Sequence, residues 1–160
     1  MNSFNPYILM KKLLFVTLIF FTLPTFAQTD EEQIKGTINQ VFDGMRKNDT
    51  TLVRQVLHTS CFLKSIGKNK TGEVNLQEDP ISGWLKQIGT KREGIVLDER
   101  LTSYHLKIDG EMAMAWTPYE FYVNDKFNHC GVDVFTMMKT DKGWKIIGIV
   151  DTRRKENCKK

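Results

Sequence analysis

The sequence predicts an α+β domain in which N-terminal helices cover one face of a strongly curved antiparallel sheet. Two observations lead to this fold. Apolar residues recur at helical spacing up to Gly89, and from Ile95 onward the period changes to two. Turn signals at residues 109–110, 124–125 and 141–143 then divide the second half into four long strands. Such strands twist and curl, so the space between the helices and the sheet is a natural pocket.

The first 27 residues have the layout of a secretory signal peptide. Lys11 and Lys12 precede an apolar run over residues 13–23, and Ala27 is a small residue at the expected cut. The run of about 11 residues is too short to cross the hydrocarbon of a membrane, which is about 30 Å thick. We therefore expect a signal peptide over residues 1–27, one domain over residues 28–160, and a periplasmic or secreted protein with no membrane attachment after cleavage.

The remaining length and charge limit the partners of that domain. Residues 28–160 are enough for one domain with a core of its own and leave no room for a second. The formal net charge of +4 falls to +2 once the two leader lysines are removed. This mild balance argues against nucleic acid or an anionic membrane as the main partner.

Three helices are expected before the strands. Thr29 and Glu32 form a capping box for a helix that extends to about residue 47, and the turn at 48–50 starts a second helix over about 50–57. A weak strand over 61–67 and a polar loop over 67–72 follow. Asp79 and Pro80 mark the start of a third helix, which Gly89 closes. The apolar stripes of the first and third helices are formed by Ile34, Ile38, Val41, Phe42 and Met45, and by Ile81, Trp84, Leu85 and Ile88.

The four strands are expected at about 95–108, 111–123, 127–139 and 144–152. Pro118 interrupts the second of them and predicts a bulge or bend there. Alternation along the third strand separates His129, Gly131, Asp133 and Phe135 from the even-numbered residues between them. The even-numbered set, and the Trp144 set on the fourth strand, are interpreted as the packing faces.

The cysteines predict one disulfide. Cys61, Cys130 and Cys158 enter an oxidising compartment if the chain is exported, so one pair forms and one thiol is left over. The pairing cannot be deduced from the sequence, and we favour Cys130 with Cys158, which ties the C-terminal tail to a strand. None of the three lies in a CxxC motif, so neither a zinc knuckle nor a thioredoxin-like motif is supported.

Three stretches carry a family resemblance over nearly the whole of residues 28–160. They are residues 41–49 (VFDGMRKND), residues 116–122 (WTPYEFY) with 126–132 (KFNHCGV), and residues 143–154 (GWKIIGIVDTRR). With the order of elements, they resemble the nuclear transport factor 2-like superfamily, of cystatin-like fold, and a bacterial branch of it labelled putative lumazine-binding or polyketide-cyclase-like. The resemblance implies a conical pocket and a homodimer. It assigns no catalytic residue, because that superfamily includes enzymes, ligand binders and association modules.

A catalytic hypothesis centres on His129. Asp133 or Asp151 would orient it, and Tyr119 or Tyr122 would polarise a carbonyl for proton transfer, since a group in an apolar cone can have a near-neutral pKa. The alternative interpretation is that His129 and Asp133 are ordinary polar positions on a half-exposed strand.

Ligand-binding residues are expected among the aromatics and at the end of the last strand. We expect Trp116, Tyr119 and Tyr122 to line a hydrophobic pocket for a planar ligand, although a core needs the same residue types. Arg153 could hold an anionic group at the pocket mouth, or it could simply pair with Asp151. Glu99 and Arg100 are interpreted as solvent-facing strand charges.

The histidines lie on different elements, at spacings that form no metal site, and no phosphate-binding or dinucleotide motif occurs, so neither metal nor cofactor is expected. Three function classes stay open, in this order: a small-molecule binder, a cofactor-free lyase, isomerase or cyclase, and a module that dimerises through the open sheet face. Catalysis predicts a titratable group with a shifted pKa inside the cavity, whereas association predicts a filled cone and an exposed apolar sheet face.

Overall fold

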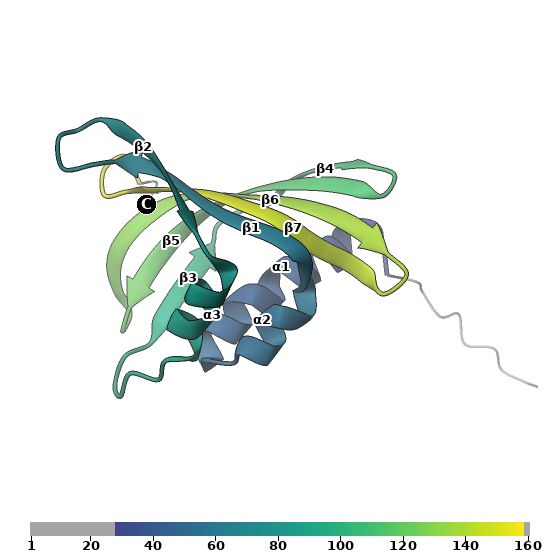
Figure 1. Cartoon of the computed structure of the whole chain (residues 1–160), viewed down its shortest axis with the longest axis horizontal. Coiled ribbons are helices and arrows are strands. Elements are labelled where there is room, and N and C mark those ends of the chain that lie inside the picture. The colour runs from purple at the N-terminus through teal and green to yellow at the C-terminus, as the bar shows by residue number, and fades with distance from the viewer. Residues whose placement is uncertain (1–27, 159–160) are drawn as a thin grey trace, which may run out of the picture.

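A computed structural model describes residues 28–158 of the chain. The predicted signal peptide over residues 1–27 lies outside the described residues. Three helices and seven strands follow one another in the described part, and Figure 1 shows the helices gathered on one side of the sheet.

The helices begin where the sequence provides caps. In α1 (Asp30–Lys47) the Thr29 hydroxyl accepts from the Glu32 N–H at 3.3 Å and the Glu32 carboxylate accepts from the Thr29 N–H at 2.9 Å, which confirms the capping box. Asp49 caps α2 (Thr50–Val56) with its carboxylate, which accepts from the Thr51 and Leu52 N–H groups. In α3 (Ile81–Gly89) the N-cap residue is Pro80, one position later than expected, because the Pro80 carbonyl accepts the first helical bonds.

The strands form one mixed sheet in the order β2-β1-β7-β6-β5-β3, with β4 also paired to β5. Only the β1 to β7 pairing is parallel, so the expectation of a purely antiparallel sheet was wrong at that one place. The strands are β1 (Leu57–Lys68), β2 (Val74–Asp79), β3 (Leu97–Leu101), β4 (His105–Asp109), β5 (Met112–Val123), β6 (Lys126–Thr140) and β7 (Gly143–Arg154).

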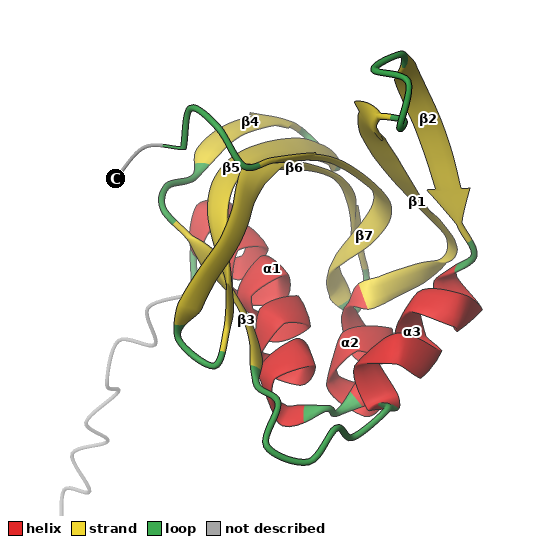
Figure 2. Cartoon of the chain, turned by 90° about the vertical axis from the view of Figure 1, so that its left-hand side faces the viewer, coloured by secondary structure: helices red, strands yellow, loops and turns green. Residues whose placement is uncertain are grey.

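The sheet curls around α1 without closing. Figure 2 shows β3 and β5 to β7 arched over α1, with α2 and α3 below and the β1–β2 hairpin projecting away from the arch. The enclosed space holds one continuous core between the helices and the concave face of the sheet. The α1 stripe provides Ile34, Ile38, Val41 and Phe42 to it, and the sheet provides Ala113, Ala115, Phe135, Met137, Ile146 and Ile149.

Two strand boundaries differ from the expectation. The segment expected as one strand over 95–108 is two strands, β3 and β4, which pair with different parts of β5 and are separated by residues 102–104. The segment after the 67–72 loop forms β2, which the sequence analysis missed. Residues of β2 are mostly exposed on both faces. The alternation of apolar and polar residues that predicts a half-buried strand is therefore weak in this segment.

Pro118 causes no bulge. The β5 to β6 register runs unbroken through Pro118 and its partner Val132. The Pro118 carbonyl accepts from Thr102, on the side of β5 that faces the gap between β3 and β4. The N–H and C=O of a residue in an antiparallel strand point to the same side, so the missing donor of Pro118 faces that gap and costs no ladder bond.

The irregularities lie elsewhere in the sheet. The β5 to β6 register shifts between Phe121 and Tyr122, and the β6 to β7 register shifts between Thr136 and Met137. Ile147 is the extra residue of the second shift, so Trp144 and Ile146 face the core before it and Ile149 and Asp151 face inward after it.

The predicted packing face of β6 was wrong. The odd-numbered residues Asp133, Phe135 and Met137 are buried against the helices, whereas Val132 and Val134 lie half-buried on the opposite face. Apolar residues occur on both faces of this strand, so alternation alone did not distinguish the inward side.

Candidate functional site

A cavity of about 210 Å³ lies between α1, α3 and the concave face of the sheet. One part of its wall is apolar: Phe42 from α1 meets Phe135 from β6 edge to face at a ring distance of 6.1 Å, and Trp84 and Ile88 approach from α3. The remaining wall, built by β3, β6 and β7, carries charged and polar groups. The cavity therefore has an apolar side and a polar side.

Three carboxyl groups, Glu99, Asp133 and Asp151, form the polar side of the cavity and are called the carboxyl cluster below. Asp133 on β6 and Asp151 on β7 are direct partners in the ladder, so their side chains share a face, and each is only 5% exposed. Glu99 comes from β3, on the far side of β5.

The sequence analysis placed Glu99 on the solvent side of a strand. The structure places it at the cavity, partly buried beside the two aspartates. The signal for this was weak, because Glu99 stands in the run Asp98-Glu99-Arg100, in which only the middle residue lines the cavity.

Burial changes the acidity of the cluster. It raises the pKa of Glu99 to about 7, the charge of Asp151 adds to this effect, and a hydrogen bond with Asp133 and the charge of Arg153 oppose it. Burial also raises the pKa of Asp133 well above its ordinary value, and the charge of Glu99, the hydrogen bond to it and the charge of Asp151 add to the increase. Asp133 therefore holds its proton well above the usual pKa range of an aspartate, and Glu99 titrates near neutral pH.

Arg153 pairs with one member of the cluster. Its Nε donates to Asp151 Oδ2 at 2.8 Å, and its side chain is otherwise 58% exposed at the edge of the cavity. The ion pair between Arg153 and Asp151, which was the alternative to anion binding by Arg153, is therefore present. Beyond the hydrogen bond between Glu99 and Asp133, two buried oxygens of the cluster, Asp133 Oδ2 and Asp151 Oδ1, have no hydrogen-bond partner among the described residues.

His129 lines the cavity next to the cluster. Its ring lies 4.8 Å from that of Phe121 and meets Tyr119 edge to face at 5.7 Å, while its Nδ1 is 2.9 Å from Asn128 Oδ1. Burial lowers the pKa of His129 and the charge of Arg153 lowers it further, although Asp151 opposes this. A neutral imidazole at the cavity wall is the consequence.

Tyr119 is buried behind that wall. Its hydroxyl donates to the Thr152 carbonyl at 3.0 Å, an arrangement that requires Gly131, because a Cβ there would lie 2.6 Å from the Tyr119 hydroxyl. Burial, with the charges of Glu99, Asp133 and Asp151, raises the pKa of Tyr119. Its hydroxyl links β5 to β7 across Gly131 of β6, so it is not free to polarise a carbonyl in the cavity.

Two further expected ligand-binding residues, like Tyr119, do not line the cavity. Trp116 is 47% exposed on the opposite face of the sheet, since it alternates with the inward-facing Ala115 and Thr117. Tyr122 follows the register shift between β5 and β6 and does not line the cavity. Its hydroxyl donates to the Glu120 carboxylate at a distance of 2.6 Å. Of the residues named from the sequence, His129, Asp133, Asp151 and Arg153 are the ones brought together.

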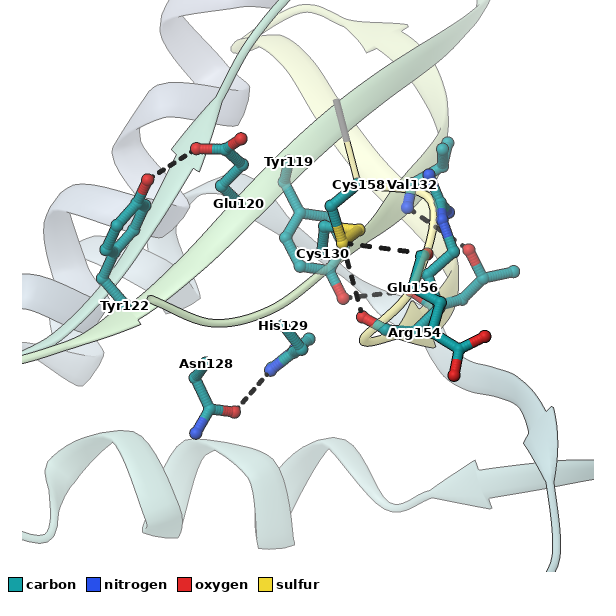
Figure 3. Close-up of a disulfide and its surroundings, with 11 residues drawn as sticks. Tyr119, Glu120, Tyr122, Asn128, His129, Cys130, Val132, Arg154, Glu156 and Cys158 are labelled. Carbon is teal, nitrogen blue, oxygen red and sulfur yellow. Dashed lines mark hydrogen bonds between the residues drawn. A yellow bond between two sulfur atoms is a disulfide. The ribbon is translucent and has the colours of Figure 1, made fainter. Parts of the chain in front are cut away.

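A disulfide ties the C-terminal tail to β6 beside the cavity. It joins Cys130 to Cys158, with a Cα separation of 5.8 Å, and Figure 3 shows it next to Tyr119 and the neighbouring His129. Cys61 on β1 is a free thiol, and burial raises its pKa to about 11, so it stays protonated and unreactive at neutral pH.

Within residues 28–158, no group of three His, Cys, Asp or Glu side chains is arranged to hold a metal ion. None of the helices there has the length and apolar character needed to cross a membrane.

Comparison with known proteins identifies a family that matches most of the chain. The family described as "Putative lumazine-binding" matches residues 29–150. Among curated proteins, none matches the chain.

Solved structures of similar fold share little sequence with it. A nuclear transport factor 2-like protein from Cytophaga hutchinsonii has a TM-score of 0.61 at 14% identity and covers 79% of this chain and all (100%) of its own. One of unknown function from Shewanella baltica has a TM-score of 0.57 at 16% identity, covering 80% and 98%. A protein of unknown function with a cystatin-like fold, from Nostoc punctiforme, has a TM-score of 0.61 at 7% identity, covering 79% and 92%. These similarities establish the nuclear transport factor 2-like, cystatin-like fold.

Proposed function

Because the chain belongs to the family described as "Putative lumazine-binding", we propose that it binds a small, partly apolar molecule in the cavity between α1, α3 and the sheet. One observation carries the proposal: a cavity of about 210 Å³ combines aromatic and aliphatic walls with convergent polar groups on one side. Pockets that bind small molecules have this composition, in which apolar area provides affinity and a few polar groups fix orientation. The volume suits a small planar molecule.

The test is native mass spectrometry of the protein purified from its own periplasmic or culture fraction. We expect a co-purifying molecule, lost in Ile149→Phe and retained in Val150→Phe. Ile149 faces the cavity and its neighbour Val150 faces the other side of the same strand, so the pair adds equal bulk on opposite faces. An empty wild-type protein, or equal occupancy of both folded variants, argues against binding in this cavity.

A second candidate, acid–base catalysis without a cofactor, is favoured by Glu99. With a pKa of about 7, this carboxyl group can both accept and return a proton at neutral pH. Asp133 supplies a neighbouring protonated carboxyl group, and His129 a neutral imidazole. We expect activity, if present, to appear as hydrogen–deuterium exchange next to the carbonyl of small ketones, followed by NMR in D₂O. Exchange that persists unchanged in Glu99→Gln contradicts this candidate.

We also propose a homodimer formed through the outer sheet face, defined as Phe62, Ile66, Met114, Trp116, Val134 and Val150. Register places Trp116, Val134 and Val150 in one row across three strands, on the side that the helices do not cover. Phe62, Ile66, Met114 and Trp116 are 36–47% exposed. A contiguous apolar face of this kind is typical of an interaction surface.

Light scattering after gel filtration tests the dimer. We expect a dimer for the wild type and a monomer for Trp116→Lys, with Thr51→Lys on the exposed surface of α2 as the charge-matched control. A monomeric wild type, or a Trp116→Lys variant that stays dimeric, excludes this interface.

Export is the last part of the proposal. Residues 1–27 have signal-peptide character, and disulfides such as Cys130–Cys158 persist in oxidising compartments. We expect the protein in the periplasm or the medium with Gln28 as its first residue, which cell fractionation and intact mass measurement will determine. Cytoplasmic protein that retains residues 1–27 contradicts this.

A further inference from the structure

The carboxyl cluster has more acceptor capacity than the described residues satisfy. Asp133 and Asp151 line the cavity and are only 5% exposed. Beyond the hydrogen bond that Asp133 shares with Glu99, the buried oxygens Asp133 Oδ2 and Asp151 Oδ1 have no hydrogen-bond partner among residues 28–158. A buried carboxylate oxygen without a donor is costly, and native proteins rarely leave one so. Two such oxygens on facing positions of β6 and β7 point to a ligand that brings N–H donors.

We propose that the cavity takes a small organic cation, of the amidinium, guanidinium or ammonium class, whose N–H groups bind the free oxygens of Asp133 and Asp151. This inference rests on the proposed function, because it concerns the same cavity, and it names the class of ligand. An amidinium group has parallel N–H donors that match carboxylate oxygens, and its aromatic or aliphatic body would lie against Phe42, Phe135 and Trp84.

The charges around the cavity favour a cation over an anion. The charged and titratable groups of the lining come from the sheet and from the segment before β3. They are Glu99 of β3, His129 and Asp133 of β6, Asp151 and Arg153 of β7, and Arg92 of the segment before β3. Tyr119 of β5 lies behind the wall. Helices α1 and α3 contribute no charged side chain to the lining. Arg153 is already bound to Asp151, Arg92 is exposed and His129 is neutral, so the lining offers an anion no unpaired buried cation. A cation that displaces the protons of Asp133 and Glu99 would instead face three ionised carboxylates.

Proton release separates a cation from a neutral ligand. Without ligand, Asp133 and part of Glu99 keep their protons because the site is buried. A bound cation favours the ionised carboxylates, so binding expels a proton and the affinity rises with pH through about 7. A neutral amide would instead use a protonated carboxyl group as donor, and its affinity would fall over the same range.

Three compounds of one shape provide the experiment: benzamidine, benzamide and benzoate, as cation, neutral molecule and anion. We expect calorimetry on the full domain to show benzamidine binding about tenfold or more tightly than benzamide, with benzoate weakest. The benzamidine affinity should increase severalfold between about pH 6 and pH 8. Titrations in two buffers with different ionisation enthalpies should reveal the released proton.

Variants test whether the carboxyl cluster causes the preference for benzamidine over benzamide. Asp133→Asn keeps the side-chain shape and removes the charge, so it should abolish the preference for benzamidine over benzamide, whereas Asp133→Glu should restore part of it. Glu93→Gln, an exposed carboxylate outside the cavity lining, should change nothing.

Each outcome has a distinct meaning. If benzamide or benzoate binds as well as benzamidine, or the affinity does not depend on pH, the cation class is wrong. Loss of that binding in Ile149→Phe would then still support a ligand cavity. If none of the three compounds binds, the cation class is overturned, and the proposed function is judged by native mass spectrometry alone.

Discussion

At the residue scale, burial and neighbouring charge determine the chemistry of the carboxyl groups. Asp98 on β3 is held between Arg46 and Arg100, at 3.0 Å and 2.6 Å, and these contacts keep its pKa below the ordinary value although burial opposes them. Glu99, the next residue, turns into the cavity and has a raised pKa. Adjacent acidic residues therefore stand on opposite sides of one strand with opposite shifts, and only the inward residue can exchange a proton near pH 7.

Glu99 should make the protein less stable as the pH rises. A carboxyl group with a raised pKa binds its proton more tightly in the folded than in the unfolded chain, so stability falls from about pH 4.5 to about pH 7. Glu99→Gln removes this decline. We expect thermal or urea unfolding to show the variant stabilised by about 1–3 kcal/mol at pH 8 and unchanged at about pH 4.5.

Glu93→Gln serves as the control, because it removes an exposed charge from the segment before β3. An equal gain for Glu93→Gln would attribute the effect to net charge, and a Glu99→Gln gain that is the same at both pH values would contradict burial as its cause.

Gly131 is a second residue whose role is steric. A Cβ at this position would lie 1.8 Å from the Thr152 carbonyl oxygen and 2.6 Å from the Tyr119 ring. We expect Gly131→Ala to lower the free energy of unfolding by about 2 kcal/mol or more, since backbone must move. Gly36→Ala, on an exposed turn of α1 with open space around it, should instead stabilise by about 0.5–1 kcal/mol. Similar effects in urea unfolding would contradict the close approach.

At the element scale, the register shift between β6 and β7 directs side chains toward the cavity. The extra residue Ile147 reverses the alternation of β7, so the same strand buries Trp144 and Ile146 at one end and directs Asp151 and Arg153 to the cavity at the other. Without that shift, strict alternation would place Asp151 and Arg153 on the outer face, and the carboxyl cluster would not form.

The position of Pro118 on β5 leads to a prediction at this scale. Because its nitrogen faces the gap between β3 and β4, no ladder bond depends on it. We expect Pro118→Val to change the free energy of unfolding by less than about 1 kcal/mol and to leave the circular dichroism spectrum unchanged. A loss well above this would mean that proline itself shapes β5.

At the scale of the whole molecule, the disulfide and the parallel strand connect distant parts of the chain. Cys130 and Cys158 are 28 residues apart in sequence, and their bond holds the tail that follows β7 against β6. Strand β1, from the N-terminal half, pairs in parallel with β7. The cavity wall thus depends on contacts that close long loops of the chain.

Removing the disulfide should therefore destabilise the whole domain. We expect Cys158→Ser to lose about 2–4 kcal/mol in unfolding experiments under oxidising conditions, because a cross-link of this span restricts the unfolded chain. Cys61→Ser, at the free thiol, is the matched control and should retain most of the stability. With reductant present, the free energies of unfolding of the wild type and Cys158→Ser should become equal. If the difference between them is the same with and without reductant, it arises from side-chain packing and not from the disulfide.

The sequence by itself determined the class of fold, the three helices with the Thr29 capping box, and the turns that divide the long strands, because these depend on local periodicity, caps and turn chemistry. Only the tertiary structure decided which strand faces look inward. One extra residue, Ile147, reverses the alternation, and a strand with apolar residues on both sides, such as β6, carries no local mark of its buried face. The carboxyl cluster depends on that choice. Glu99, Asp133 and Asp151 meet because β3, β6 and β7 curl around one cavity, a long-range arrangement that the spacing of residues along the chain does not encode.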